Sequence, residues 1–280
     1  MILIADSGVT KTEWCRITDQ HTTETLITQG INPFYQEAEN ITSILLKEFT
    51  GVRKFEAIFF YGSGCINREK QDIVKAGLLG IFEAGTIFVG SDLLAAAQSL
   101  CQTKAGIACI LGTGSNSCYY NGCEITENVS PLGFILGDEG SGAVLGKKLV
   151  GDILKNQLPQ FLIDQFFETY QVTGATILEN VYKKPFPSRY LAGFTRFLSE
   201  NIAVPEIELL VTTAFREFIS RNLMKYPGIG QIPIHFTGSI AFFFKEQLQK
   251  SLEEQGLILG NIEKAPMKGL IRYHNRKITL

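Results

Sequence analysis

Short apolar runs alternate with helically spaced apolar positions along the first part of the chain. Residues 2–5 form a continuous apolar run that ends at Asp6, and residues 57–61 form another that ends in a glycine-containing turn. Apolar runs bounded by turn residues are typical of buried strands. The whole pattern predicts strands at 2–5, 12–17, 57–61 and 86–89, and helices at 37–50, 68–82 and 93–101. This part of the chain is therefore predicted to be α/β.

Near residue 105 the pattern starts again with a second strand, glycine turn and strand. The apolar run 106–111 is followed by a polar turn at 112–116 and another strand at 117–120. Two such units so far apart indicate a duplicated fold rather than a short repeat array. We expect domains at 1–105 and 106–264. The remaining pattern predicts helices at 141–156, 158–170, 188–202, 206–225 and 240–255, with a strand at 234–236.

Charge and composition narrow the classes of partner. The 280 residues include 26 basic and 28 acidic side chains, so the net charge of −2 gives no general attraction to nucleic acid or anionic lipid. Met1 leads almost directly into the first apolar run, without the features of a secretion signal. No apolar stretch approaches the roughly 20 residues that span a bilayer. We expect a cytoplasmic protein that binds neither nucleic acid nor membrane.

The cysteines and histidines show no metal-binding or catalytic pattern. None of the six cysteines forms a CxxC pair or lies at zinc spacing from a histidine, and Cys15 and Cys109 lie in apolar strand-like runs. We interpret most of the cysteines as small buried core residues. His21, His235 and His274 stand alone, outside any HExxH arrangement. A histidine-based mechanism is not indicated.

The first turn, residues 6–12, places a carboxylate, hydroxyl groups and a lysine at the end of a strand. Asp6, Thr10 and Lys11, together with backbone N–H groups, would suit a phosphate and a magnesium ion. This is not a Walker A loop, because GxxxxGK[ST] is missing and the chain continues into a strand instead of a helix. An ordinary hairpin, in which these residues serve turn geometry and solubility, explains the turn equally well.

The second turn, residues 112–116, combines two glycines with hydroxyl and amide groups. The glycines permit close approach of a ligand to the backbone, and the side chains add hydrogen-bond donors. Two such turns facing one another would hold the phosphates of a nucleotide from both sides. The two turns together favour nucleotide binding over coincident turn chemistry.

A third unit, Thr237-Gly238-Ser239, lies between a strand and a helix. A glycine there would let a planar ring or a ribose approach the backbone, and a helix N-terminus favours partial negative charge. A serine cap at the start of the helix explains the same residues. For this unit alone, the serine cap is the better explanation.

In this order the three units resemble those of the ATPase superfamily of actin, hexokinase and the heat-shock chaperones. Residues 112–116, GTGSN, followed by residues 136–142, LGDEGSG, are similar to the motifs of the N-acetylglucosamine kinase group. That group shares a broader family with the ATPases that activate 2-hydroxyacyl-CoA dehydratases and benzoyl-CoA reductases. The resemblance covers nearly the whole chain and implies two ribonuclease H-like, actin-like ATPase domains with a nucleotide cleft between them. It also implies that residues 265–280 return to pack on the first domain, for which a loose tail is the alternative.

The resemblance implies an ATP-dependent kinase that phosphorylates a hydroxyl, expected to be O6, of an amino sugar such as N-acetylglucosamine. Asp6 matches the residue that holds Mg²⁺, and Asp92 matches the catalytic base that accepts the hydroxyl proton. A helix N-cap is the structural alternative for Asp92. The residues implied to contact ATP are Thr10, Lys11, Gly112, Thr113, Gly114, Ala192, Gly238 and Ser239. Those implied to contact the sugar are Asn32, Asp92, Ser115, Asn116 and Asp138.

Two departures from the family pattern bear on activity and substrate. The first turn has Ser7 and Val9 where the family more often has glycines, which is expected to alter the approach of a phosphate. Relatives carry a tryptophan against the sugar before GDEGS, whereas Leu132 lies near that place in this chain. N-acetylglucosamine, a muramic acid derivative, glucosamine and an unacetylated hexose all stay open as substrates. The oligomeric state also stays open, with a homodimer expected from the resemblance.

Two other function classes follow from the same resemblance. An activator ATPase would need cysteines at a dimer interface to hold an iron–sulfur cluster, and none of the six cysteines lies in that branch's sequence context. A sensor or scaffold would keep the fold without turnover. Such regulators often carry a helix-turn-helix extension, and this chain starts directly with its first strand. Asp6, Asp92 and Asp138 together favour the kinase.

Overall fold

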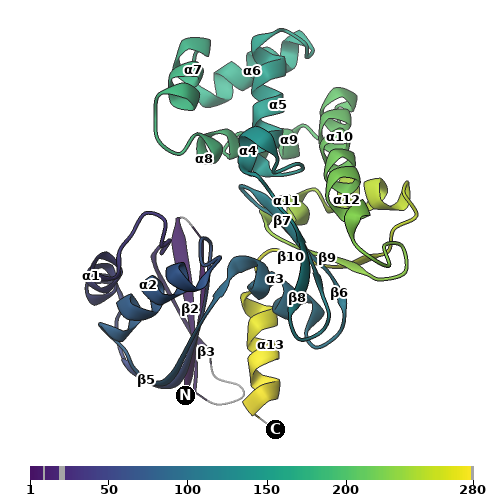
Figure 1. Ribbon diagram of the computed structural model, residues 1–280. Helices are drawn as coiled ribbons and strands as arrows, with labels where there is room; N and C mark the ends of the chain where they lie inside the picture. Colours follow the sequence, from purple (N-terminus) through teal and green to yellow (C-terminus); the bar gives the residue numbers. More distant parts are fainter. Residues whose placement is uncertain (9, 19–22, 279–280) are drawn as a thin grey trace. The chain divides into compact units, whose positions relative to one another are not determined.

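The computed structural model describes residues 1–8, 10–18 and 23–278, and the chain divides into two compact units (Figure 1). Unit 1 comprises residues 1–104, 122–125 and 265–280, and unit 2 comprises residues 105–121 and 126–264. Val9 of the first turn and His21 lie outside the described residues. Each unit has its own five-stranded sheet.

The sheet of unit 1 contains β1 (Ile2–Ser7), β2 (Lys11–Ile17), β3 (Thr23–Gln29), β4 (Lys54–Gly62) and β5 (Glu83–Ser91). The strand order is β3-β2-β1-β4-β5. β1, β2 and β3 pair antiparallel in succession, whereas β4 runs parallel to β1 and β5 parallel to β4. The carboxyl ends of β1, β4 and β5 therefore lie side by side at one edge of the sheet, where ligands commonly bind in open α/β sheets.

Helices cover both faces of this sheet. One face packs against α1 and α2 and the other against α3 and α13. Side chains alternate between the faces along β1, because Leu3 and Ala5 belong to the first core and Ile2 and Ile4 to the second. Both sides of β1 are thus buried, as its continuous apolar run predicts. The helices are α1 (Ala38–Glu48), α2 (Arg68–Leu79), α3 (Asp92–Cys101) and α13 (Met267–Ile278).

The C-terminal helix α13 packs closely against α3. A Cβ added to Gly269 would lie 2.3 Å from the carbonyl oxygen of Ser99, so only glycine permits this approach. Gln102 Nε2 donates to the carbonyl oxygen of Gly269 at 3.0 Å, and the buried His274 ring stacks on Phe59 with centroids 3.9 Å apart. Residues 267–278 therefore form a packed helix, and the alternative of a loose tail is wrong.

The sheet of unit 2 contains β6 (Gly106–Leu111), β7 (Ser115–Tyr120), β8 (Ile125–Val129), β9 (Ile234–Thr237) and β10 (Leu259–Glu263). The strand order is β10-β9-β6-β7-β8, with β6 antiparallel to β7 and parallel to β9. This order matches unit 1 strand for strand. In each sheet the first strand lies in the centre, with its hairpin partner on one side and a parallel strand on the other. The two sheets confirm the predicted duplication of the fold.

Unit 2 differs from unit 1 in the long helical segment between β8 and β9 (Figure 1). A core that includes Phe166, Phe197 and Phe215 holds this segment together. In unit 1 the corresponding connection, residues 30–53, is fully described and contains only α1. The helices of unit 2 are α4 (Gly133–Leu136), α5 (Gly142–Leu154), α6 (Gln160–Tyr170), α7 (Gly174–Tyr182), α8 (Pro187–Ala192), α9 (Thr195–Glu200), α10 (Pro205–Arg221), the 3-10 helix η1 (Leu223–Lys225), α11 (Ser239–Phe243) and α12 (Lys245–Glu253).

The structure corrects several predicted boundaries. The predicted helices 188–202 and 240–255 each break in two, at residues 193–194 and at Phe244. Asp6 and Ser7 continue β1 instead of belonging to the turn, because they pair with β2. The pattern also fails to predict β3, β8, β10, α4 and α7.

All of the cysteines except Cys123 are buried. Their interpretation as core residues is therefore confirmed for five of the six. Within the part of the chain that the structure describes, no group of three or more His, Cys, Asp and Glu side chains could hold a metal ion. None of the described helices is both long enough and apolar enough to cross a membrane.

Candidate functional site

The candidate residues fall into two sets, one in each unit. Unit 1 holds the first turn, the carboxylates Asp6 and Asp92, and Asn32. Unit 2 holds the GTGSN turn, the loop around Asp138 and the start of α11. The geometry of each set follows from the strand ends and turns that carry it.

Asp6, Ser63 and Asp92 lie at the carboxyl ends of the parallel strands of unit 1. Asp6 is the second-last residue of β1, Ser63 follows β4, and Asp92 follows β5. Ser63 Oγ donates to Asp92 Oδ2 at 2.8 Å, and Ser63 N donates to the carbonyl oxygen of Ser7 at 2.9 Å. The turn after β4 therefore links the ends of the two neighbouring strands.

Asp92 is the first residue of α3, and the helix is capped by another side chain. Ser91 Oγ accepts from Leu94 N at 3.2 Å, so the structural alternative of Asp92 as the N-cap is wrong. Asp92 Oδ1 accepts from Leu93 N at 2.8 Å. Burial raises the pKa of Asp92, and the hydrogen bonds from Ser63 and Leu93 oppose this rise. Its carboxylate is thus held in a fixed orientation with raised basicity, which suits a proton acceptor.

The environment of Asp6 disfavours the ionised form of its carboxyl group. Burial, followed by the charges of Asp92 and Glu13, raises its pKa to about 7 against the opposing effect of Lys11. A divalent cation would offset both the burial and the repulsion between the carboxylates, and oxygen ligands suit Mg²⁺. The acidic pair therefore fits a magnesium ion. Thr10 and Lys11 are exposed at the adjoining turn.

Ser7 attaches the first turn to the neighbouring segment. Its Oγ lies 2.7 Å from Thr12 Oγ1, donates to the carbonyl oxygen of Ile31 at 3.0 Å and accepts from Ile31 N at 2.9 Å. Ser7 is almost fully buried. Its hydroxyl is therefore engaged by Thr12 and Ile31 within the core.

Asn32 and Asn116, one in each unit, both have their carbonyl oxygens engaged. Asn32 Oδ1 accepts from Phe34 N at 2.9 Å, and Asn116 Oδ1 accepts from Ser117 N and from Asn128 Nδ2, both at 2.9 Å. Backbone donors thus fix the orientation of both amides. Among the described residues, neither Nδ2 group has an acceptor, so both asparagines offer N–H donors that suit sugar oxygens.

The turn Gly112-Thr113-Gly114 has a backbone arrangement that fits phosphate oxygens. Gly112 N donates to the carbonyl oxygen of Gly114 at 2.9 Å, and the carbonyls of Gly112 and Thr113 accept from Gly142 N and Ala143 N at the start of α5. The N–H groups of Thr113 and Gly114 form no hydrogen bond with a described residue. A Cβ added to Gly112 would meet nothing within 4 Å. The turn therefore combines two available donors with open space beside the backbone.

Gly142 brings Ala192 and α11 to this turn. A Cβ added to Gly142 would lie 3.1 Å from the carbonyl oxygen of Gly112, 3.2 Å from Ala192 Cβ and 3.4 Å from Ile240 Cδ1. Gly146, one turn further along α5, packs directly on the backbone of Leu191. The close approach of α5 to α8 thus places Ala192 beside the GTGSN turn.

Gly238 is required by backbone packing. It has φ 118°, and an added Cβ would lie 2.3 Å from the carbonyl oxygen of Leu111. The sequence pattern suggests that a ligand approaches this glycine. In the structure, the backbone of β6 approaches it. Gly238 is itself the N-cap of α11 and Ser239 makes no capping hydrogen bond, so the serine-cap alternative is wrong. Thr237 Oγ1 is buried and has no partner among the described residues.

Asp138 lies against the GTGSN turn in a left-handed backbone conformation. Its φ is 53°, its N–H donates to the carbonyl oxygen of Pro131 at 2.8 Å, and its Oδ1 accepts from Ser115 N at 3.3 Å. The pKa of Asp138 is raised to about 6, mainly by burial and also by the charge of Glu139, against the opposing effects of the Ser115 N–H and Lys147. The fold thus brings Asp138 and Ser115 together, and the Asp138 carboxylate is mostly ionised near neutral pH.

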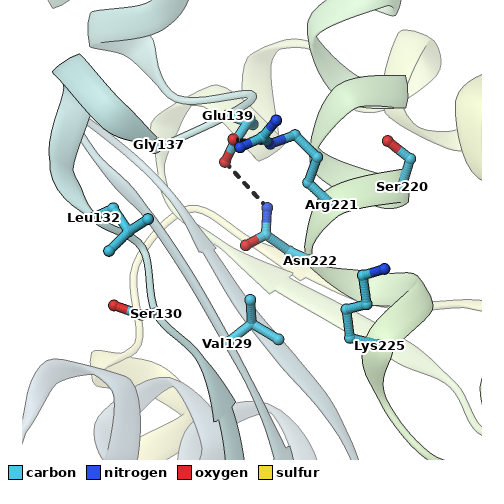
Figure 2. A pocket seen from close by; sticks show the side chains of 9 residues that line it. All are labelled: Val129, Ser130, Leu132, Gly137, Glu139, Ser220, Arg221, Asn222 and Lys225. Atoms are coloured by element: carbon cyan, nitrogen blue, oxygen red, sulfur yellow. Dashed lines mark hydrogen bonds and ion pairs between the residues drawn. The ribbon is translucent and has the colours of Figure 1, made fainter.

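Glu139 binds the end of α10 next to this loop. Its Oε1 pairs with Arg221 Nε at 2.5 Å, and its Oε2 accepts from Asn222 Nδ2 at 3.2 Å (Figure 2). These side chains belong to a pocket of about 330 Å³ within unit 2. Its lining consists of Val129, Ser130, Leu132, Gly137, Glu139, Ser220, Arg221, Asn222 and Lys225.

Sequence reasoning assigns no role to Ser63, Asn128 or Arg221. Ser63 has a weak signal, because it lies between two glycines after an apolar run. Asn128 and Arg221 come from an edge strand and a helix end, and no local motif marks them. Their contacts with Asn116 and Glu139 exist only in the folded chain.

Solved structures show full-length similarity to this chain. A protein of Porphyromonas gingivalis with a proposed N-acetylglucosamine kinase activity is 44% identical, with 99% of this chain and 100% of that chain covered and a TM-score of 0.93. A second proposed N-acetylglucosamine kinase, from Chromobacterium violaceum, is 18% identical over 97% of this chain and 98% of that chain, with a TM-score of 0.74. A ROK family glucokinase from Streptomyces griseus, solved with glucose and AMPPNP, is 13% identical over 96% of each chain, with a TM-score of 0.54. No protein-family model and no curated protein matches this chain.

Proposed function

This chain belongs to the N-acetylglucosamine kinase-like family of actin-like ATPases, and we propose that it transfers the γ-phosphate of ATP to a hydroxyl of an amino sugar. The predicted α/β actin-like fold is confirmed by the two matching sheets and by these relatives. The observation that carries the proposal is Asp92, an oriented carboxylate at the end of β5 beside a second carboxylate, Asp6.

Asp92 is the proposed base. The hydrogen bonds from Ser63 Oγ and Leu93 N use one lone pair on each carboxylate oxygen and favour the ionised form. Burial acts in the other direction and keeps the group basic. Asp92 would accept the proton of the sugar hydroxyl as that oxygen attacks phosphorus, with O6, a primary hydroxyl, as the proposed acceptor.

Asp6 is the proposed partner of the cation, with Thr10 and Lys11 near the phosphates. When bound, Mg-ATP supplies the phosphoryl group and the positive charge that neutralises it. In unit 2, the N–H groups of Thr113 and Gly114 would donate to phosphate oxygens in the space beside Gly112. Ala192, Gly238 and Ser239 lie around the same turn and are the proposed neighbours of the adenosine.

Asn32, Ser115, Asn116 and Asp138 are the proposed sugar ligands. Asn32 and Asn116 supply N–H donors, whereas the Asp138 carboxylate accepts from sugar hydroxyls. A set of donors and acceptors with fixed orientations discriminates against acceptors that lack a hydroxyl, because the protein groups would then lose their partners. N-acetylglucosamine is the proposed substrate, on the similarity to the two proposed N-acetylglucosamine kinases.

A coupled ADP-release assay with Mg-ATP and a panel of amino sugars and hexoses tests the proposal. We expect sugar-dependent turnover that Asp92→Asn lowers by at least about 100-fold, since general base catalysis contributes roughly 10²–10⁴. Asp72→Asn, an exposed aspartate of α2, is the matched control and should keep full activity. No turnover with any sugar, alongside intact nucleotide binding, would overturn the kinase and favour a sensor. Sugar-independent ATP hydrolysis would instead favour the activator class.

A further inference from the structure

The pocket beside the Asp138 loop is small and has two different sides (Figure 2). Its volume of about 330 Å³ lies near the lower limit of ligand pockets, roughly 300–1,000 Å³. It therefore suits a small molecule or one substituent of a larger one, rather than a nucleotide. Val129 and Leu132 give the pocket an apolar side, whereas Arg221, Asn222 and Lys225 give it hydrogen-bond donors.

The charges of the lining favour an anion. Arg221 and Lys225 are positive and Glu139 is the single acid, so two cations against one anion leave one excess positive charge. Glu139 already accepts from Arg221 and Asn222. Its side chain is 13% exposed and that of Arg221 is 63% exposed, so solvent reaches the guanidinium far more than the acid. Lys225 is exposed and forms no ion pair with any residue that the structure describes.

The pocket adjoins the proposed sugar ligands of unit 2. Gly137 and Glu139, the two chain neighbours of Asp138, both belong to its lining. Val129 follows Asn128, whose Nδ2 donates to Asn116 Oδ1 at 2.9 Å. An occupant of the pocket would therefore lie next to the segments that hold Asp138 and Asn116.

We propose that this pocket binds a small oxyanion, a carboxylate or a phosphate group, through Lys225 and Arg221. Charge-assisted hydrogen bonds from a lysine and an arginine are the usual means of binding such groups. The apolar side formed by Val129 and Leu132 accommodates carbon atoms attached to the anion. Two sources of the anion share this chemistry, namely a free anion and an acidic substituent of the sugar, of which the second rests on the proposed function.

Calorimetric titration of the full chain with inorganic phosphate, in the presence of saturating Mg-ADP, tests the free anion. We expect Lys225→Met to raise the phosphate Kd about tenfold, which corresponds to the loss of one charged hydrogen bond. Lys225→Arg keeps the charge and should keep the affinity. Lys245→Met removes an exposed lysine of the same unit outside the pocket and should leave the Kd unchanged.

Titration with two sugars, in the absence of nucleotide, tests the acidic substituent. The probes are N-acetylglucosamine and N-acetylmuramic acid, which carries an additional lactyl carboxylate. If the sugar supplies the anion, Lys225→Met weakens the binding of the acidic sugar about tenfold and leaves that of N-acetylglucosamine unchanged. A response to phosphate alone identifies a free anion as the occupant and still supports the proposal.

The proposal is wrong if Lys225→Met behaves like Lys245→Met in both titrations. It is equally wrong if the unmodified chain binds no phosphate and does not distinguish the two sugars. Both readouts are affinities without turnover. A chain that binds an anion here but fails the ADP-release assay would overturn the proposed function and leave the anion pocket intact.

Discussion

Ser63 Oγ donates to Asp92 Oδ2 at 2.8 Å, and this bond joins the turn after β4 to the first residue of α3. It also opposes the effect of burial, because a donor to the carboxylate favours its ionised form. Ser63 N donates in turn to the carbonyl oxygen of Ser7 in β1. A serine without a role of its own in the proposed chemistry thus sets both the orientation and the basicity of the proposed base.

Replacing Ser63 by alanine should move the pH dependence of the reaction. Loss of a hydrogen bond to a charged group costs about 1.5–3 kcal/mol, and one pKa unit corresponds to about 1.4 kcal/mol. We therefore expect the acidic limb of kcat/KM in Ser63→Ala to shift upward by about one to two pH units. Ser63→Thr keeps a hydroxyl and serves as the control. An unshifted limb in Ser63→Ala would show that Asp92 does not control the rate.

Replacing Asp6 by asparagine should stabilise the chain while abolishing magnesium-dependent activity. The pKa of Asp6 is about 7 in the folded chain against an ordinary value of 3.8, so between these values the folded state retains a proton that the unfolded state has lost. The unfolding free energy therefore falls as pH rises from about 4 to about 7. The charge of Asp6 costs up to about 4 kcal/mol above pH 7.

Chemical unfolding of Asp6→Asn and the unmodified chain at pH 4 and pH 8, with EDTA present, measures this cost. We expect the variant to be the more stable chain at pH 8 and the two to be nearly equal at pH 4. Added Mg²⁺ should stabilise only the unmodified chain. An equal stability at pH 8 would contradict the burial of an unpaired charge at Asp6.

Two glycines with open space beside them provide a test of the proposed phosphate site and a matched control. Neither Gly112 nor Gly151 has an atom within 4 Å of an added Cβ. Gly112→Ala should fold normally but raise the KM for ATP by at least about tenfold, because the methyl group occupies space beside the proposed phosphate donors. Gly151→Ala, inside α5, should leave the KM unchanged and stabilise the chain by about 1 kcal/mol. Equal KM values for ATP would rule out the GTGSN turn as the phosphate site.

Sugar affinity should depend on the ionisation of Asp138. Its pKa of about 6 means that the carboxyl group gains a proton as pH falls below this value. The protonated group loses acceptor capacity, so we expect the sugar Kd to rise between pH 7 and pH 5. Asp138→Asn should bind weakly at both pH values, and Asp164→Asn, an exposed residue of α6, should keep the pH dependence. A flat pH profile in the unmodified chain would remove Asp138 from the sugar site.

The sequence pattern predicts the buried strands well and the edge strands poorly. β1, β4 and β6 are buried on both faces and appear as continuous apolar runs. β8 has no fully buried residue and β10 contains a bulge, so neither shows a clear alternation of polar and apolar positions. A local pattern of polar and apolar residues reports how one segment is buried. The formation of these two strands depends instead on pairing with neighbouring strands.

The candidate site likewise has features that the sequence predicts and features that it does not. Asp6, Asp92 and the GTGSN turn follow predicted strands, so their positions at strand ends are visible in the sequence. The cap at Ser91, the engaged hydroxyl of Ser7 and the packing of Gly238 on β6 are tertiary features. In each of these three cases a residue type common in turns and caps is used for a contact that sequence alone does not specify.

The unequal connections of the two matching sheets separate the proposed site into a part at the strand ends and a part in an added segment. Asp6 and the GTGSN turn lie at the ends of the equivalent strands β1 and β6, and Asp92 follows β5. Asp138, Ala192 and Arg221 all lie in the segment that joins β8 to β9. On the proposed assignments, the insertion adds one sugar ligand, Asp138, one neighbour of the adenosine, Ala192, and the anion pocket at Arg221. Changes in this single stretch of chain can therefore alter what surrounds the substrates, while the strand ends that carry the two carboxylates and the phosphate turn stay as they are.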